Sequence, residues 1–154
     1  MWISLNGLTR YVPDFPGEYI LSVNSPRDGD PNGNLFAEYP NNQWNTVNVT
    51  DFGVPTGAAA VDVFARLTIS KGNVTQGHQT TSAIRKMGVT TEPQPWLWKA
   101  RADGEENGTR EDHSTITIPL VDDEFEWLWE TSWNAASTNY PIGSAALFFV
   151  GYWI

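Results

Sequence analysis

Cysteine is absent from this sequence of 154 residues, and basic residues are few. The absence of cysteine excludes disulfide bonds and thiolate ligands for a metal ion. Nine Lys and Arg residues stand against eighteen Asp and Glu residues, so the net charge is −9. A surface this acidic repels phosphate backbones, and we therefore expect no nucleic acid as a partner.

Long apolar runs are also missing from the sequence. No run reaches the roughly 18 apolar residues of a transmembrane helix, so we expect no membrane insertion. The opening residues, MWISLNGLTR, have neither the basic end nor the apolar centre of a secretory signal. We therefore expect a cytoplasmic product, with residues 1–154 forming a single domain large enough to bury its own core.

Signatures of common enzyme classes do not occur in the sequence. There is no G-x-S-x-G, no H-E-x-x-H and no phosphate-binding glycine loop. The two histidines, His78 and His113, lie in polar segments typical of solvated turns. A hydrolase using Glu124 and Glu126 is an alternative, because a glycosidase needs two facing carboxylates. Their alternation with apolar residues is more typical of a solvent face, so we expect no enzymatic activity.

Alternation of apolar and polar residues dominates the second half of the chain. Its clearest examples are residues 59–70, 114–120 and 124–130. One predicted face consists of Val61, Val63, Ala65, Leu67 and Ile69, and the other of Asp62, Phe64, Arg66 and Thr68. Residues 144–154 are apolar on both faces, which predicts a central strand covered on both sides. Residues 121–123 predict a hairpin turn.

Shorter strands are predicted at residues 2–5, 19–23, 35–38, 43–50, 80–86 and 96–99. Clusters of Gly, Pro, Asn and Asp separate them, and the polar residues 102–113 predict a mobile loop. Many short strands at this spacing predict an all-β fold: a single antiparallel, jelly-roll-like β-sandwich of about eight to ten strands.

Residues 28–38, DGDPNGNLFAE, match the beginning of a calcium-binding EF-hand loop, D-x-[DN]-x-[DN]-G. Gly33 occupies the sharp turn, but the twelfth position, where a bidentate Glu belongs, is Tyr39. The flanking residues predict strands instead of helices. We interpret the segment as a polar turn, with no resident cofactor, and a calcium site in a β-sheet context remains the alternative. Its candidate ligands are Asp28, Asp30, Asn32 and Asn34.

Eight tryptophans are many for so short a chain. Indoles stabilise sheets as cross-strand pairs, and they also form contact surfaces for sugars and subunits. The three that we expect in the core are Trp127, Trp129 and Trp153. The candidates for an exposed contact surface are Trp2, Trp44, Trp96, Trp98 and Trp133.

The order of segments from residue 47 onward resembles a known class of viral module. It consists of VNVTDFGVPTGAAAVDVFARLTIS, then SAIRKMG, then ITIPLVDDEFEWLW and the terminal FFVGYWI. This pattern is similar to small β-sandwich modules on the virions of tailed bacteriophages, at tail-fibre tips or as capsid decoration proteins. The resemblance covers residues 47–154, and residues 1–46 form an N-terminal portion outside it.

The resemblance implies a non-enzymatic structural protein that attaches to the particle or to a host. Its partners would be other virion proteins and copies of itself, with a trimer as one arrangement. It would be assembled in the host cytoplasm and located in the virion. The alternative is a lectin-like carbohydrate-binding module that contacts a host-surface glycan through exposed Trp residues, with or without calcium.

Overall fold

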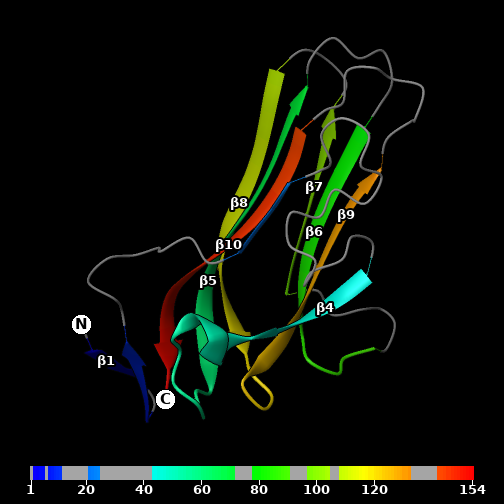
Figure 1. Cartoon of the computed structure of the whole chain (residues 1–154). Helices are drawn as coiled ribbons and strands as arrows, with labels where there is room; N and C mark the ends of the chain where they lie inside the picture. The colour runs from blue at the N-terminus through cyan, green and yellow to red at the C-terminus, as the bar shows by residue number, and fades with distance from the viewer. Residues whose placement is uncertain are drawn as a thin grey trace.

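The computed structural model describes the backbone of residues 2–5, 7–11, 21–24, 43–71, 78–90, 97–104, 108–132 and 142–154. All strand pairs in these segments are antiparallel, and the strands form two sheets packed against each other (Figure 1). The predicted all-β sandwich is thereby confirmed. Among the described residues, no helix is long and apolar enough to cross a membrane.

Sheet A has the strand order β1-β2-β10-β5-β8, with β3 also paired to β10. Its strands are β1 (Trp2–Leu5), β2 (Leu8–Tyr11), β3 (Leu21–Asn24), β5 (Ala60–Lys71), β8 (Gly108–Pro119) and β10 (Ile142–Trp153). Sheet B has the order β4-β9-β6-β7. Its strands are β4 (Gln43–Asn48), β6 (His78–Lys86), β7 (Trp98–Gly104) and β9 (Glu124–Ser132).

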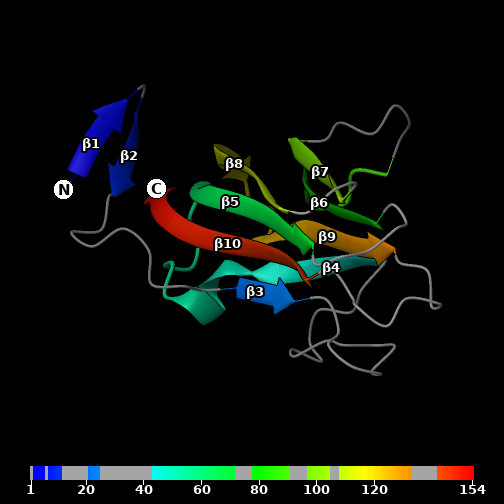
Figure 2. The same ribbon diagram turned by 90° about the horizontal axis from the view of Figure 1, so that it is seen from above.

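The hairpin of β1 and β2 stands beside the end of β10, at one end of the sandwich (Figure 2). Its register pairs with β10 are Tyr11 with Tyr152 and Arg10 with Trp153. Two further backbone hydrogen bonds join Thr9 and Ile154, at 2.8 and 2.9 Å. The last residues of β10 therefore hold the N-terminal hairpin in place.

The hydrophobic core lies between the two sheets. From sheet A it contains Val61, Val63, Ala65, Leu67, Ile118, Ala145, Leu147 and Phe149. The alternation of β5 and β8 predicted the members that come from those two strands. Sheet B contributes the large aromatic residues Phe125, Trp127 and Trp129, which are at most 1% exposed. The indole N–H of Trp127 donates to Ser82 Oγ at 2.9 Å, so its polar atom is satisfied inside the core.

The connection between β4 and β5 adds buried residues to this core. The predicted strand 43–50 ends at Asn48, and the 3₁₀-helix η1 (Val49–Phe52) follows directly. Asn48 caps it, because its side-chain oxygen accepts a hydrogen bond of 3.0 Å from the Thr50 amide. Gly53, with φ of 82°, ends the helix in the left-handed conformation that glycine favours.

Three sequence expectations are corrected by the structure. Residues 102–113 are not one loop, since β7 extends to Gly104 and β8 begins at Gly108. The polar composition reflects an edge strand, where exposed charged side chains are favourable. Strand β10 is central in its sheet, but its outer face is only partly covered, with Phe148 half-buried. Trp153 lies outside the core cluster and is also half-buried.

Candidate functional site

The outer face of sheet A, which points away from sheet B, carries the most distinctive exposed group of side chains. Alternation along β5 sends Val63, Ala65 and Leu67 into the core and Phe64 and Arg66 outward. In register with Phe64 are Phe148 on β10 and Thr115 on β8. Three neighbouring strands therefore place their side chains on one continuous surface.

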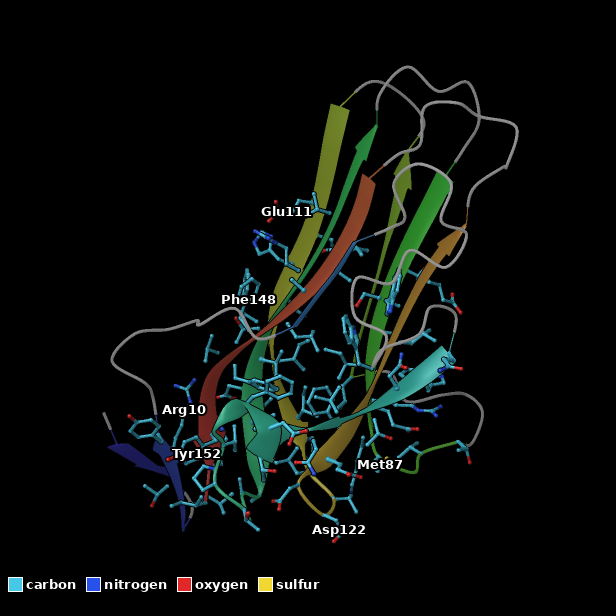
Figure 3. The ribbon with its side chains drawn as sticks, viewed as in Figure 1. Arg10, Met87, Glu111, Asp122, Phe148 and Tyr152 are labelled. Carbon is cyan, nitrogen blue, oxygen red and sulfur yellow. The ribbon has the colours of Figure 1, made fainter. Side chains whose placement is uncertain are left out.

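Aromatic rings lie side by side at the centre of this surface. The centroids of the Phe64 and Phe148 rings are 5.9 Å apart with the planes tilted by 51°, and the Phe64 ring lies 5.6 Å from the His113 ring with a tilt of 42°. Both phenylalanines are half-buried, whereas His113 is exposed. Such ring distances are typical of favourable aromatic contacts. Figure 3 shows Phe148 and Glu111 on the side of sheet A that faces away from sheet B.

Polar groups surround these rings. The Arg66 guanidinium lies 5.6 Å from the centroid of Phe148, within the range of a cation–π contact. His113 pairs in register with Arg66, and its Nδ1 is 3.8 Å from Glu111 Oε1. That distance is too long for a hydrogen bond, and the two side chains are 60% and 45% exposed. We define Phe64, Arg66, Glu111, His113, Thr115 and Phe148 as the outer-face patch.

A second polar cluster lies on the same face, toward the N-terminal hairpin. Asp62 is 3% exposed and accepts hydrogen bonds from Thr117 Oγ1 at 2.6 Å and from the Trp153 indole at 3.2 Å. Its other carboxylate oxygen pairs with the Arg10 guanidinium. These groups come from β2, β5, β8 and β10. The buried charge is neutralised internally, so this cluster joins the hairpin to the sandwich.

A third cluster lies on the outer face of sheet B. Arg85 on β6 forms a bidentate ion pair with Glu126 on β9, at 2.7 and 3.1 Å. The Trp44 indole, from β4, covers the guanidinium at 4.0 Å. Arg85 is only 6% exposed, because it is enclosed by its partners across three strands. The Trp44 ring is therefore engaged with its own chain and only partly open to a ligand.

The structure brings together few of the contact residues that the sequence suggested. Trp44 is half-buried on Arg85, as above. Trp2 lies in β1 and pairs with Tyr11, and Trp98 lies in β7 and pairs with Ile84. Trp96 and Trp133 lie outside the described residues. The proposal of a Trp contact surface therefore stays a prediction.

The candidate calcium ligands also lie outside the described residues; they are Asp28, Asp30, Asn32 and Asn34. Within the described segments, no group of three or more His, Cys, Asp or Glu side chains is placed to hold a metal ion. Of the two carboxylates considered for a hydrolase, Glu126 is paired with Arg85. Glu124 is half-buried at the beginning of β9.

Sequence reasoning missed the outer-face patch, although one signal for it was present. Phe64 interrupts the polar face of an alternating strand, but an outward aromatic residue indicates a contact surface only when its neighbours extend it into a patch. His113 was interpreted as part of a turn, but it lies on β8 opposite Arg66. The pairing of Phe64 with Phe148 depends on the register between β5 and β10, which the sequence does not state.

Comparison with protein-family models, with curated proteins and with solved structures finds no match for this chain. The fold and the surface together define the class of this protein: a two-sheet antiparallel sandwich with a partly exposed aromatic face on sheet A.

Proposed function

We propose that this protein is a non-enzymatic surface module of a tailed-bacteriophage virion, of the capsid-decoration or tail-fibre type. It would attach to its own particle or to a host. The virion setting is supported by the sequence resemblance of residues 47–154. An adhesive role is supported by the pairing of the buried charges within the chain, while the rings and polar groups on the outer face of sheet A are accessible.

The observation that carries an adhesive role is the contrast between buried and exposed groups. Among the described residues, the two buried charged side chains are Asp62 and Arg85, and each has an ion-pair partner within the chain. Both buried charges are therefore engaged in contacts within the chain. The exposed outer face of sheet A instead offers rings, a guanidinium and hydroxyl groups, which are suited to contact.

The proposal is tested on phage particles from a host that carries the gene. Particles are banded in a density gradient, and the chain is sought in the band by mass spectrometry. We expect it to sediment with the particles in a fixed ratio to the major capsid protein. An abundant host protein of similar mass controls for carry-over. Detection only in the soluble fraction would contradict a virion protein.

Carbohydrate binding is a second candidate function, favoured by one specific observation. Phe64 and Phe148 form an aromatic surface flanked by hydrogen-bonding side chains on an exposed sheet face. Sugar rings have apolar faces and polar rims, so they match such a surface. A glycan array probed with the labelled chain tests this candidate, and absence of binding to every glycan would contradict it.

A further inference from the structure

Arg66 differs from Arg10 and Arg85, the other two arginines whose side chains the structure describes. Arg10 and Arg85 each form an ion pair with a carboxylate, on Asp62 and Glu126. Among the side chains that the structure describes, none forms a hydrogen bond or an ion pair with the Arg66 guanidinium. Its described contact is with the Phe148 ring. A cation–π contact uses none of the guanidinium N–H donors, so they can still donate to a ligand.

Hydrogen-bonding side chains lie on the neighbouring strand β8, at and beside the position in register with Arg66. Glu111 and His113 are both well exposed, and the 3.8 Å between them leaves each free of a hydrogen bond to the other. Thr115 is exposed opposite Phe64. The patch thus combines a carboxylate that accepts, a guanidinium that donates and a hydroxyl that does both.

The charges of Arg66 and Glu111 balance within the patch, and this argues against an anionic ligand. Arg66 carries one positive charge and Glu111 one negative charge, on a chain whose net charge is −9. An anionic polymer would be repelled by the chain as a whole and by Glu111 locally. An uncharged polyol has no such penalty, and its neighbouring hydroxyls can both donate and accept.

We infer that the outer-face patch binds an uncharged pyranose ring. The C–H face of the sugar lies on the Phe64 ring, the Arg66 guanidinium beside Phe148 donates to hydroxyl oxygens, and Glu111 accepts from a hydroxyl. This inference rests on the second candidate function and moves its site from tryptophans to phenylalanines on sheet A. It is independent of whether the protein is part of a virion.

The test uses the full chain and a set of neutral gluco-, galacto- and manno-oligosaccharides, with oligogalacturonate as the acidic comparison. Affinity is measured by calorimetry for the wild type, Phe64→Thr, Arg66→Gln and Leu8→Thr. Thr is a strand former that already occupies neighbouring outer positions, so Phe64→Thr removes the ring and retains β propensity. Leu8 is 43% exposed on the hairpin, which makes Leu8→Thr a matched control.

We expect a neutral oligosaccharide to bind the wild type and to bind about tenfold more weakly to Phe64→Thr and to Arg66→Gln. Leu8→Thr should bind as the wild type does. Added salt should leave the affinity nearly unchanged, because no ion pair is formed. In a titration followed by amide NMR of the wild type, shifts should concentrate on β5, β8 and β10.

Other outcomes separate this inference from the function on which it rests. Glycan binding that survives Phe64→Thr, with shifts on other strands, overturns the patch and retains a carbohydrate-binding protein. Binding of oligogalacturonate alone, lost in salt, overturns the assignment of an uncharged ligand. Absence of binding to any saccharide overturns both. Circular dichroism of each variant identifies loss of fold, and the NMR titration of the wild type does not depend on the variants.

Discussion

At Gly151 of β10, strand β2 and the Asp62 side chain of β5 approach so closely that no side chain fits. A β-carbon on this residue would lie 2.9 Å from the carbonyl oxygen of Tyr11 and 3.2 Å from Asp62 Oδ2. The register of β10 against β5 also shifts between Phe149 and Gly151. Such an irregularity bends a strand and redirects its side chains. It precedes the residues of β10 that pair with the hairpin.

Replacing this glycine should loosen the hairpin. We expect Gly151→Ala to lower the free energy of unfolding by about 1–3 kcal/mol, because the backbone of Tyr11 must move away. Hydrogen exchange should show faster exchange at the amides of Thr9 and Ile154, which are hydrogen-bonded across this junction. Chemical denaturation gives the change in stability.

Gly88→Ala is the matched control for this substitution. Gly88 has φ of 76° and no atom within 4 Å of a built β-carbon. Its replacement should cost about 1 kcal/mol through backbone conformation alone, with the hairpin amides protected as in the wild type. Equal exchange at Thr9 in both variants would show that the close contact at Gly151 is unimportant.

The turn between β8 and β9 is a second place where single residues decide the conformation. Asp122 and Asp123 both have positive φ, of 52° and 65°, and Val121 and Glu124 exchange backbone hydrogen bonds of 3.1 and 3.0 Å. The hairpin turn predicted at residues 121–123 is thus a two-residue loop, Asp122 and Asp123, in the left-handed form that Asn and Gly favour. Asp123 also accepts from the Gly57 amide at 2.7 Å.

Substitutions at Asp122 should therefore follow conformational preference. Asp122 is exposed, so its replacement disturbs no core contact. We expect Asp122→Asn to raise the free energy of unfolding by about 0.5 kcal/mol and Asp122→Val to lower it by about 1–3 kcal/mol. Thermal unfolding of both variants measures the difference. Equal midpoints for the two variants would argue against the left-handed conformation.

At the scale of elements, the sequence predicts which face of a strand is buried better than it predicts which strands become neighbours. Alternation predicted both faces of β5, because the period of a strand depends only on neighbouring residues. The first half of the polar strand β8 was mistaken for part of the loop predicted at residues 102–113, because an edge strand exposes side chains as a loop does. Its twelve residues pair with β5 regardless of their polarity.

The candidate site was less predictable than the fold, for the same reason. The ion pair of Arg85 and Glu126 joins residues 41 positions apart, and that of Arg10 and Asp62 joins residues 52 apart. No local spacing encodes such contacts; they follow from which strands become neighbours. Likewise, the alternation of β5 indicates that Phe64 points outward, but only the register between β5 and β10 identifies Phe148 as its neighbour.

The ion pair on the outer face of sheet B provides a test of this three-strand arrangement. We expect Arg85→Lys to lower the free energy of unfolding by about 1–2 kcal/mol, since an ammonium group cannot form the bidentate pair or stack on Trp44. The exposed neighbour Lys86 offers the reverse control, and Lys86→Arg should leave stability unchanged. Urea denaturation measures both, and an unchanged Arg85→Lys would mean that charge alone holds these strands together.

At the scale of the whole molecule, the two sheets share a single described core, and the net charge governs which molecules can approach the surface. The chain carries −9, so copies of it repel one another at low ionic strength. A homo-oligomer, as the virion resemblance implies, must overcome this repulsion at its interface. Salt screens it, since the Debye length falls to about 10 Å at 0.1 M.

Self-association should therefore strengthen with salt. We expect sedimentation velocity to show a larger oligomeric fraction at ~0.3 M than at ~0.02 M sodium chloride, at one protein concentration. Circular dichroism at both salts should be identical, because the core between the sheets is uncharged. Oligomers that dissociate as salt is added would indicate ion pairs between subunits or a basic partner. A monomer at every salt concentration would contradict the homo-oligomer. Attachment would then depend on contacts with other proteins or with glycans.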